Sequence, residues 1–348
     1  METATFSSDV ILPVSIQQKQ VQKNFEDLGR FVAESDVMKN LLTTIEKVAP
    51  TFTPVLLIGE FGVGKGSLAR LIHEKSFLAG PFFSVSCSLN REGKLEQELF
   101  GYDAGAFTGA TQTRKGIFEA AHGGTVFIEE IHEMSLELQT KILRYLQSGE
   151  IVRIGGKEAI RSQVRLVVSS CKNLEGLVAR GLFREDLFYR INTITLEVAP
   201  IRRRRADILP LIQYFMEKNK TILGRLPVSL SAEAEKVVLN YDWPGNLREI
   251  ANFCERLQIM HEGTVDVHEL PDSMTLKNDQ DVTRNYDPYV KLSDLERHWI
   301  LKAMEYYRGN KTQAAQSLGI TIKTLYNKLH EYGVFNRYAI HNKMEGDI

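Results

Sequence analysis

Residues 59–67 read Gly59-Glu60-Phe61-Gly62-Val63-Gly64-Lys65-Gly66-Ser67, between an apolar run at 54–58 and a helical pattern that begins at Leu68. A buried strand, a glycine-rich turn and a helix start form a cradle in which backbone N–H groups converge on a phosphate, with Lys65 reaching the β- and γ-oxygens. The alternative is a glycine-rich strand-to-helix turn with a surface lysine. The agreement of strand, spacing and helix favours a phosphate-binding loop in an α/β domain.

The rest of the chain first alternates strand-like and helical patterns and then becomes helical. Further apolar runs typical of strands lie at 81–87, 123–130, 164–170 and 191–198. Because helical patterns separate them, we expect a parallel sheet covered on both faces. From residue 201 the strand signal stops, and a helical unit is predicted from patterns at 205–218, 231–241 and 246–261.

A polar stretch at 271–288 predicts a linker, beyond which helical patterns lie at 291–307, 312–318 and 321–332. A glycine turn between the last two patterns indicates a helix-turn-helix, whose second helix enters the major groove of DNA. Lysines there would bind mainly phosphate, and Asn or Thr would reach base edges. The residues expected to face DNA are Thr321, Lys323, Thr324, Asn327 and Lys328. The alternative is an ordinary two-helix hairpin.

The composition is ordinary for a soluble globular protein of two or three units. Of the 348 residues, 43% are hydrophobic and 25% are charged, which allows a large core. A formal net charge of -1 excludes a uniformly basic nucleic-acid binder but not a local basic surface. No apolar run approaches the roughly 20 residues of a membrane span, and the N-terminus lacks a secretion signal. We therefore expect a cytoplasmic protein.

The cysteines also favour a reducing compartment. Cys87, Cys171 and Cys254 are far apart, odd in number and without the spacing of metal ligands. We expect all three to be buried thiols.

Two carboxylates, Glu129 and Glu130, follow the apolar run Val126-Phe127-Ile128, in the position of a Walker B pair. Hydrolysis of a phosphoanhydride requires one carboxylate near Mg²⁺ and another that polarises the attacking water. We assign Glu129 to the metal and Glu130 to the water. The alternative is a solvated acidic pair at a strand end, but the phosphate loop upstream favours the catalytic interpretation.

The segment Gly105-Ala106-Phe107-Thr108-Gly109-Ala110 matches, at every position, the GAFTGA signature of the AAA+ activators of sigma-54 RNA polymerase. The chain resembles this NtrC-like family of bacterial enhancer-binding proteins over roughly residues 30–270, and its last helices resemble the family's Fis-like DNA-binding domain. The resemblance implies an AAA+ P-loop sheet with a helical lid and an all-α helix-turn-helix domain. It also implies that the loop rises when ATP is bound and contacts sigma-54, with Phe107 as the apolar contact between glycine hinges.

The resemblance assigns roles to three arginines. Residues 183–190 resemble the segment in which Arg184 and Arg190 act on the nucleotide of a neighbouring subunit, which implies a head-to-tail ring. Residues 243–249 resemble sensor II, in which Arg248 reaches the phosphates from the lid. The basic run at 202–205 is interpreted as structural or interfacial. Family members pair through the helix before the helix-turn-helix, here through Leu292, Leu295, Trp299, Ile300 and Ala303.

Several positions depart from the usual sequences. Gly66 stands where a Ser or Thr usually holds Mg²⁺, and Glu129 replaces an Asp. Ser86 stands where an Asn usually restrains the catalytic glutamate, and Cys171 with Lys172 replaces the Thr-Asn of sensor I. These changes put the rate of hydrolysis in doubt more than nucleotide binding, because Lys65 and the loop glycines are retained.

We therefore predict a transcription activator that binds enhancer DNA and uses ATP and Mg²⁺ to remodel closed complexes of sigma-54 RNA polymerase. We expect it to act as a homo-oligomeric ring, hexameric and with paired DNA-binding domains. The alternative is a DNA-binding regulator with a vestigial ATPase that acts by occupancy. The predicted divisions are a short N-terminal segment (1–28), an α/β ATPase subdomain (29–200), a helical lid (201–271), a linker (272–290), and a helix-turn-helix domain with its tail (291–348).

Overall fold

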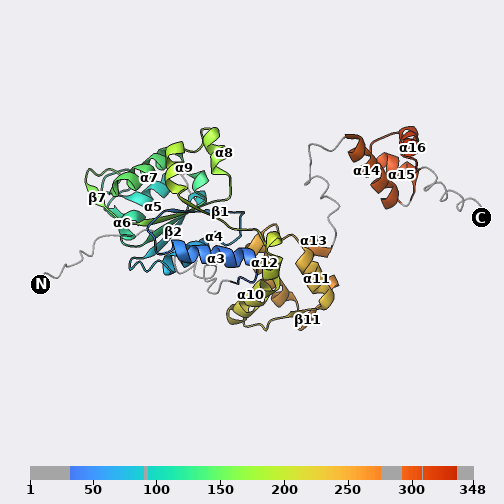
Figure 1. Ribbon diagram of the computed structural model, residues 1–348, viewed down its shortest axis with the longest axis horizontal. Coiled ribbons are helices and arrows are strands. Elements are labelled where there is room, and N and C mark those ends of the chain that lie inside the picture. Colours follow the sequence, from blue (N-terminus) through green and yellow to red (C-terminus); the bar gives the residue numbers. More distant parts are fainter. Residues whose placement is uncertain (1–31, 90–92, 276–291, 308, 335–348) are drawn as a thin grey trace, which may run out of the picture. The chain divides into compact units, whose positions relative to one another are not determined.

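The computed structural model describes residues 32–89, 93–275, 292–307 and 309–334 (Figure 1). The chain divides into two compact units, residues 1–275 and 276–348. The expected N-terminal segment and most of the expected linker lie outside the described residues. Among the described helices, none combines the length and the apolar character that crossing a membrane requires.

A five-stranded parallel sheet forms the centre of the first unit. Its strands in chain order are β1 (Val55–Ile58), β2 (Phe82–Ser86), β5 (Thr125–Glu129), β8 (Arg165–Ser170) and β9 (Ile194–Glu197). Across the sheet the order is β2-β5-β8-β1-β9, and every neighbouring pair is parallel, which confirms the predicted sheet. Because the carboxyl ends of parallel strands share one edge, the segments that follow β1, β5 and β8 meet there.

Alternate residues of the strands face opposite sides and build two cores. On β5, Val126 and Ile128 pack into one core, whereas Phe127 packs into the other. Figure 1 shows helices on both sides of the strands. The first core is covered by α5 (Lys94–Phe100), α6 (Ile117–Ala120), α7 (Leu136–Ser148), α8 (Leu174–Ala179) and α9 (Glu185–Ile191), and the second by α3 (Asp36–Val48) and α4 (Lys65–Glu74).

A helical lid follows the sheet in the same unit. It comprises α10 (Ile208–Leu223), α11 (Ala232–Asn240), α12 (Asn246–Met260) and the short α13 (Asp272–Thr275). Its core surrounds the fully buried Trp243. Two short strands, β10 (Ser229–Leu230) and β11 (Thr264–Val265), pair within it. The prediction that strands stop at residue 201 is therefore wrong in this detail, because two-residue strands leave no periodic signal.

Two antiparallel hairpins add to the predicted elements. β3 (Gly101–Tyr102) pairs with β4 (Arg114–Lys115), and β6 (Glu150–Val152) pairs with β7 (Ala159–Arg161). The hairpins are joined, because the N–H of Asp103 donates to the carbonyl of Ile154 (3.0 Å) and the N–H of Ile154 donates to the carbonyl of Gly101 (3.0 Å). The first hairpin carries residues 105–110.

The second unit is a three-helix domain with its own core. Its helices are α14 (Leu292–Tyr306), α15 (Lys311–Ser317) and α16 (Ile322–Glu331). The buried side chains of Ile300, Met304, Leu325 and Leu329 pack together in it. Asn310 caps α15 and Thr321 caps α16. The predicted two helices and their turn are thus present.

A buried arginine on β8 fixes the end of α3 to the sheet. The guanidinium of Arg165 donates to the carbonyl of Val48 (3.0 Å) and to that of Ala49. Carbonyls at the end of a helix have no partner in the next turn, and a cation there also complements the helix dipole. Burial lowers the pKa of Arg165 to about 10, so the side chain stays charged at neutral pH.

We expect Arg165→Met to lower the free energy of unfolding by about 1–3 kcal/mol, because the buried carbonyl of Ala49 loses its guanidinium donor. The carbonyl of Val48 also loses a hydrogen bond but still accepts from Thr51. Urea unfolding followed by circular dichroism measures the change. Arg161→Met on β7 is the matched control, since the Arg161 side chain is exposed and its removal is worth less than about 0.5 kcal/mol. Equal stability of the two variants would contradict the role assigned to Arg165.

Candidate active site

Residues 59–64 form the loop between β1 and α4, and residues 65–67 are the first turn of α4, so the predicted strand, turn and helix start are present. Gly62 and Gly64 lie in the left-handed region, with φ of 77° and 102°. A Cβ at Gly62 would lie 2.4 Å from the carbonyl oxygen of Gly245, so the lid approaches too closely for any other residue. The N–H of Leu247 donates to the carbonyl of Gly62 (2.9 Å), which ties the loop to α12.

Lys65 is buried and held by three oxygens. Its Nζ donates to the carbonyls of Gly59 (2.8 Å) and Glu60 (3.1 Å), and it forms an ion pair with Oε1 of Glu130 (3.0 Å). An incoming phosphate would offer the same ammonium group a substitute for these contacts. The lysine is thus preorganised as an anion-binding group at the start of α4.

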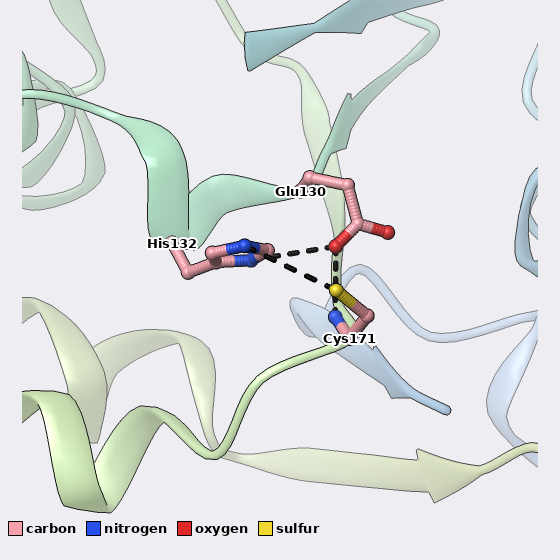
Figure 2. A group of neighbouring side chains, drawn as sticks. All are labelled: Glu130, His132 and Cys171. Atoms are coloured by element: carbon pink, nitrogen blue, oxygen red, sulfur yellow. Dashed lines mark hydrogen bonds and ion pairs between the residues drawn. The ribbon is translucent and has the colours of Figure 1, made fainter. Parts of the chain in front are cut away.

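Glu130, immediately after β5, is the centre of a polar cluster (Figure 2). Its φ of 51° is unusual for a residue with a side chain. Oε2 accepts from the backbone N–H of Cys171 (2.8 Å) and lies 3.3 Å from Nδ1 of His132. Burial raises the pKa of Glu130, but Lys65 and the Cys171 amide lower it by a larger amount. The pKa of Glu130 therefore lies below its usual range. The carboxylate is therefore ionised at neutral pH.

Glu129 is the last residue of β5. The hydroxyl of Ser84 donates to Oε1 of Glu129 (3.1 Å). A Cβ built at Gly66 would lie 3.7 Å from the same oxygen, which is an ordinary contact distance. Gly66 and Glu129 thus lie next to one another, with room for a small side chain.

One cavity of about 810 Å³ joins these groups. Its lining includes loop residues 61–67 together with Glu129, Glu130, Ser169 and Arg248. The guanidinium carbon of Arg248 lies 4.1 Å from the centre of the Phe61 ring, a cation–π contact at the mouth of the loop. The structure therefore brings together the phosphate loop, both carboxylates and the lid arginine that the sequence singles out.

Gly59 and Glu60 instead line a second cavity of about 500 Å³. Glu60 accepts from Arg202 (2.8 Å to Oε2) and from Nδ2 of Asn246 (3.2 Å). The hydrogen bond from Arg202 is the main reason why the pKa of Glu60 lies below its usual range. Glu60 is thus engaged by the lid rather than directed into the larger cavity.

The basic run at 202–205 is used within the chain, as predicted. Arg202 binds Glu60, Arg203 binds Glu197 (2.9 Å) and Arg205 binds Asp242 (3.4 Å). Arg204 is buried and donates to the carbonyl of Val63 (2.8 Å). The run therefore joins the sheet, the phosphate loop and the lid.

Arg184 and Arg190 do not line the larger cavity. Arg184 donates to Asp186 (2.7 Å) and Thr140 (3.3 Å), and Arg190 donates to the carbonyl of Leu146 (3.1 Å). Arg184 immediately precedes α9, and Arg190 lies in its last turn. Within one chain the structure does not bring these arginines to the phosphate loop.

Residues 105–110 form a tight loop on the β3–β4 hairpin. The N–H of Gly105 donates to the carbonyl of Ala110 (2.7 Å), which closes the loop. The Phe107 ring meets Tyr102 edge-on at 5.0 Å between centroids and remains 37% exposed. A Cβ at Gly155, in the β6–β7 hairpin, would lie 2.6 Å from that of Ala106, so the two hairpins touch. The Gly155-Gly156 pair is the sequence signal that points to this second hairpin.

Four of the five residues expected to face DNA are exposed on or before α16, namely Thr321, Lys323, Thr324 and Asn327. Lys328 is half-buried and forms an ion pair with Glu296 of α14 (2.8 Å). On the expected pairing helix, Trp299 is exposed, but Ile300 is buried in the domain's own core. Ile300 is therefore not available for pairing. The side chains of Leu292 and Leu295 lie outside the described residues.

The prediction for the cysteines is wrong for Cys171. Cys87 and Cys254 are buried, and burial raises the pKa of Cys87 to about 12. Cys171 is exposed, because it follows β8 beyond the edge of the sheet. His132 was not singled out by the sequence, although it lies two residues after Glu130 and its ring faces both Glu130 and Cys171 (Figure 2). Burial lowers its pKa, so the imidazole is neutral at neutral pH.

Three family models match successive parts of the chain. Residues 31–197 match the Sigma-54 interaction domain, residues 202–286 match the AAA+ ATPase lid domain, and residues 291–332 match the Fis family of bacterial regulatory proteins. The first two matches cover the sheet and the lid that enclose the larger cavity, and the third covers the three-helix domain.

Curated proteins and solved structures agree with these matches. The transcriptional regulatory protein FlbD of Caulobacter vibrioides is 37% identical over 324 residues, which cover 88% of this chain and 71% of FlbD. The regulatory protein AtoC of Escherichia coli is 38% identical, over 88% of this chain and 68% of AtoC. The crystal structure of NtrX from Brucella abortus with ATP has a TM-score of 0.66 at 31% identity, and covers 92% of this chain and 73% of NtrX.

Because Gly66 lies next to Glu129, a substitution at position 66 tests the assignment of Glu129 to Mg²⁺. We expect Gly66→Ser to lower the Mg²⁺ concentration required for half-maximal ATP hydrolysis about fivefold, because one added oxygen ligand is worth about 1 kcal/mol. Gly66→Ala is the matched control, since it adds the same Cβ without a hydroxyl. An equal Mg²⁺ requirement in both variants would show that position 66 does not face the metal.

Proposed function

The chain belongs to the sigma-54-dependent transcriptional regulators, with a sigma-54 interaction domain, an AAA+ lid and a Fis-type DNA-binding domain, and from this premise we propose that it hydrolyses ATP in a head-to-tail ring and uses the nucleotide cycle to move the 105–110 loop against sigma-54. The observation that carries the proposal is that Lys65, Glu129 and Glu130 line a single cavity at the carboxyl edge of the sheet. Groups that bind phosphate, hold a metal and orient water are thereby within reach of one ligand.

In the proposed reaction, Lys65 binds the β- and γ-phosphates of ATP, and the N-terminus of α4 adds partial positive charge. Glu130 orients and polarises the attacking water, a task that suits an ionised carboxylate. Arg248, stacked on Phe61 at the cavity mouth, reaches the phosphates from the lid.

Glu129 would hold Mg²⁺, whose chemistry is to neutralise charge on the phosphate oxygens. The donor set fits this ion, because carboxylate and hydroxyl oxygens meet at Glu129 and Ser84. Gly66 contributes no side-chain ligand, so water molecules and phosphate oxygens would complete the coordination.

Arg184 and Arg190 would complete the site of a neighbouring subunit. Their placement away from the cavity of their own chain supports this assignment, since an arginine that acts in trans has to project from a different face. Delivery of such a cation to the γ-phosphate makes hydrolysis depend on assembly.

The 105–110 loop would transmit the nucleotide state. It is closed by a hydrogen bond between its ends, hinged at two glycines with positive φ, and braced by the β6–β7 hairpin. A short loop of this kind has few intermediate arrangements, so a shift of its base moves Phe107 as a unit. The exposed part of that ring is the apolar contact for sigma-54, while the exposed residues of α16 bind enhancer DNA.

Phe107→Ala should leave the ATPase rate within about twofold of wild type and reduce open-complex formation by sigma-54 holoenzyme at least tenfold, because the loop lies outside the nucleotide cavity. Phe52→Ala is a matched control, since Phe52 is similarly exposed in a different part of the unit. Parallel loss of both activities in Phe107→Ala would argue against a contact role for the loop.

Mixing two inactive variants tests the arginine in trans. Lys65→Ala lacks a working nucleotide loop and Arg184→Ala lacks the arginine, yet in mixed rings about a quarter of the interfaces combine an intact loop with an intact arginine. We expect an equimolar mixture to recover about a quarter of the wild-type ATPase rate. Mixed assemblies that form but stay inactive would overturn the assignment.

A different result would favour the occupancy model. If Glu130→Gln leaves nucleotide turnover unchanged, the cavity is not a hydrolytic site, and the chain acts on transcription by binding DNA alone.

A further inference from the structure

We propose that Glu130, His132 and Cys171 form a binding site for a thiophilic divalent cation, with Zn²⁺ as the best fit, and that an ion in this site stops ATP hydrolysis. The three residues lie just beyond the carboxyl ends of two neighbouring strands, since Glu130 and His132 follow β5 and Cys171 follows β8 (Figure 2). The second part of the proposal rests on the hydrolytic role of Glu130, whereas the first part does not.

The ligand atoms are already close together. One oxygen of Glu130, one ring nitrogen of His132 and the sulfur of Cys171 all lie within 4.8 Å of one another. Nδ1 of His132 is 3.3 Å from Oε2 of Glu130, and Nε2 is 4.0 Å from Sγ of Cys171. Zinc bonds of about 2.0–2.3 Å place tetrahedral ligands about 3.3–3.6 Å apart. Since one atom of each side chain already lies within 4.8 Å of the other two, the ligands have to approach one another by at most about 1.5 Å, and rotation of the exposed Cys171 side chain moves the sulfur.

The surroundings of His132 suit a metal ligand. With Nε2 bound to the ion, Nδ1–H faces the hydroxyl of Ser170 at 3.2 Å, a hydrogen bond that fixes the ring. Oε1 of Glu133 lies 3.8 Å from Nε2 and is the nearest candidate for a fourth ligand. The His132 side chain is only 2% exposed, whereas Cys171 is exposed, so the ion enters past the thiol.

The thiol decides which ion binds. Oxygen ligands alone would favour Mg²⁺, but a Cys, His and Glu set favours Zn²⁺ over Mg²⁺. Binding converts the Cys171 thiol to a thiolate and releases one proton to solvent, while the oxidation states of sulfur and metal stay unchanged. The site is therefore distinct from the expected Mg²⁺ position at Glu129.

An ion here would act on hydrolysis through Glu130. Oε2 would be bound to the metal, so the carboxylate would be held toward His132 and Cys171 and could not turn to orient a water molecule, even after a phosphate had taken Lys65 from Oε1. The cation also lowers the basicity of the carboxylate. A cell with raised free Zn²⁺ would thus hold the ATPase in an inactive state.

Titration of the full chain with Co²⁺ as a spectroscopic substitute for Zn²⁺ tests the site. We expect a sulfur-to-cobalt charge-transfer band with one ion per chain, and displacement of that ion by Zn²⁺. Cys171→Ser should abolish the band, and His132→Gln should weaken binding at least about tenfold. His268→Gln is the matched control, since His268 is exposed and remote in sequence from the cluster. A spectrum without the sulfur band, or one unchanged in Cys171→Ser, would overturn the proposal.

The ATPase arm is measured as the ratio of rates with and without Zn²⁺, at excess Mg²⁺-ATP and with free Zn²⁺ set by a chelator buffer. We expect the ratio to fall at least tenfold in wild type and to stay near one in Cys171→Thr. Cobalt binding with an unchanged ratio would overturn the inhibitory role but not the site. A chain without any ATPase activity would refute the proposed hydrolysis, and the spectral titration would still decide whether the cation binds.

Discussion

The ion pair between Lys65 and Glu130 connects the two strands on which the site depends. Lys65 follows β1 and Glu130 follows β5, with β8 between them in the sheet. Both charges are largely buried, so each requires a partner, and each is the other's. A nucleotide phosphate would replace Glu130 as the partner of Lys65. The carboxylate would then lose one of its restraints at the moment when a phosphate arrives, which links the occupancy of the cavity to the position of Glu130.

The lid is coupled to the same pair through the backbone of the loop. Gly62 accepts from Leu247 of α12, and Gly62 has no room for a side chain against Gly245. At the other end of the lid, the buried Asp207 accepts from the N–H groups of Glu34 and Ser35 (2.7 Å each), immediately before α3. The lid therefore contacts both the phosphate loop and the helix that covers one face of the sheet. A shift of the phosphate loop would therefore act directly on the lid through a hydrogen bond, and through the lid on α3.

Elements with a strong local signal were predictable, whereas pairings of a few residues were not. The phosphate loop, the strand before Glu129 and the helix predicted at 246–261 each combine composition with period, and the structure contains all of them. The β6–β7 hairpin has only three residues in each strand, so its pairing is set by contacts with the neighbouring hairpin. The exposure of Cys171 depends on how far it lies beyond the edge of the sheet. Burial preferences of a residue type cannot supply such a distance.

The departures from the usual family sequence change the contacts of the two carboxylates less than the sequence suggests, because a backbone group supplies one of the hydrogen bonds that hold Glu130. The bond that holds Oε2 of Glu130 comes from the N–H of Cys171, and every residue except proline offers that donor. The change from Thr to Cys at this position therefore retains the contact and alters only what the side chain can bind. Glu129, one methylene longer than Asp, is held by Ser84 rather than left free. The chain thus keeps both carboxylates in place at the cavity, and it has a thiol and an imidazole beside Glu130, the carboxylate to which we assign the attacking water.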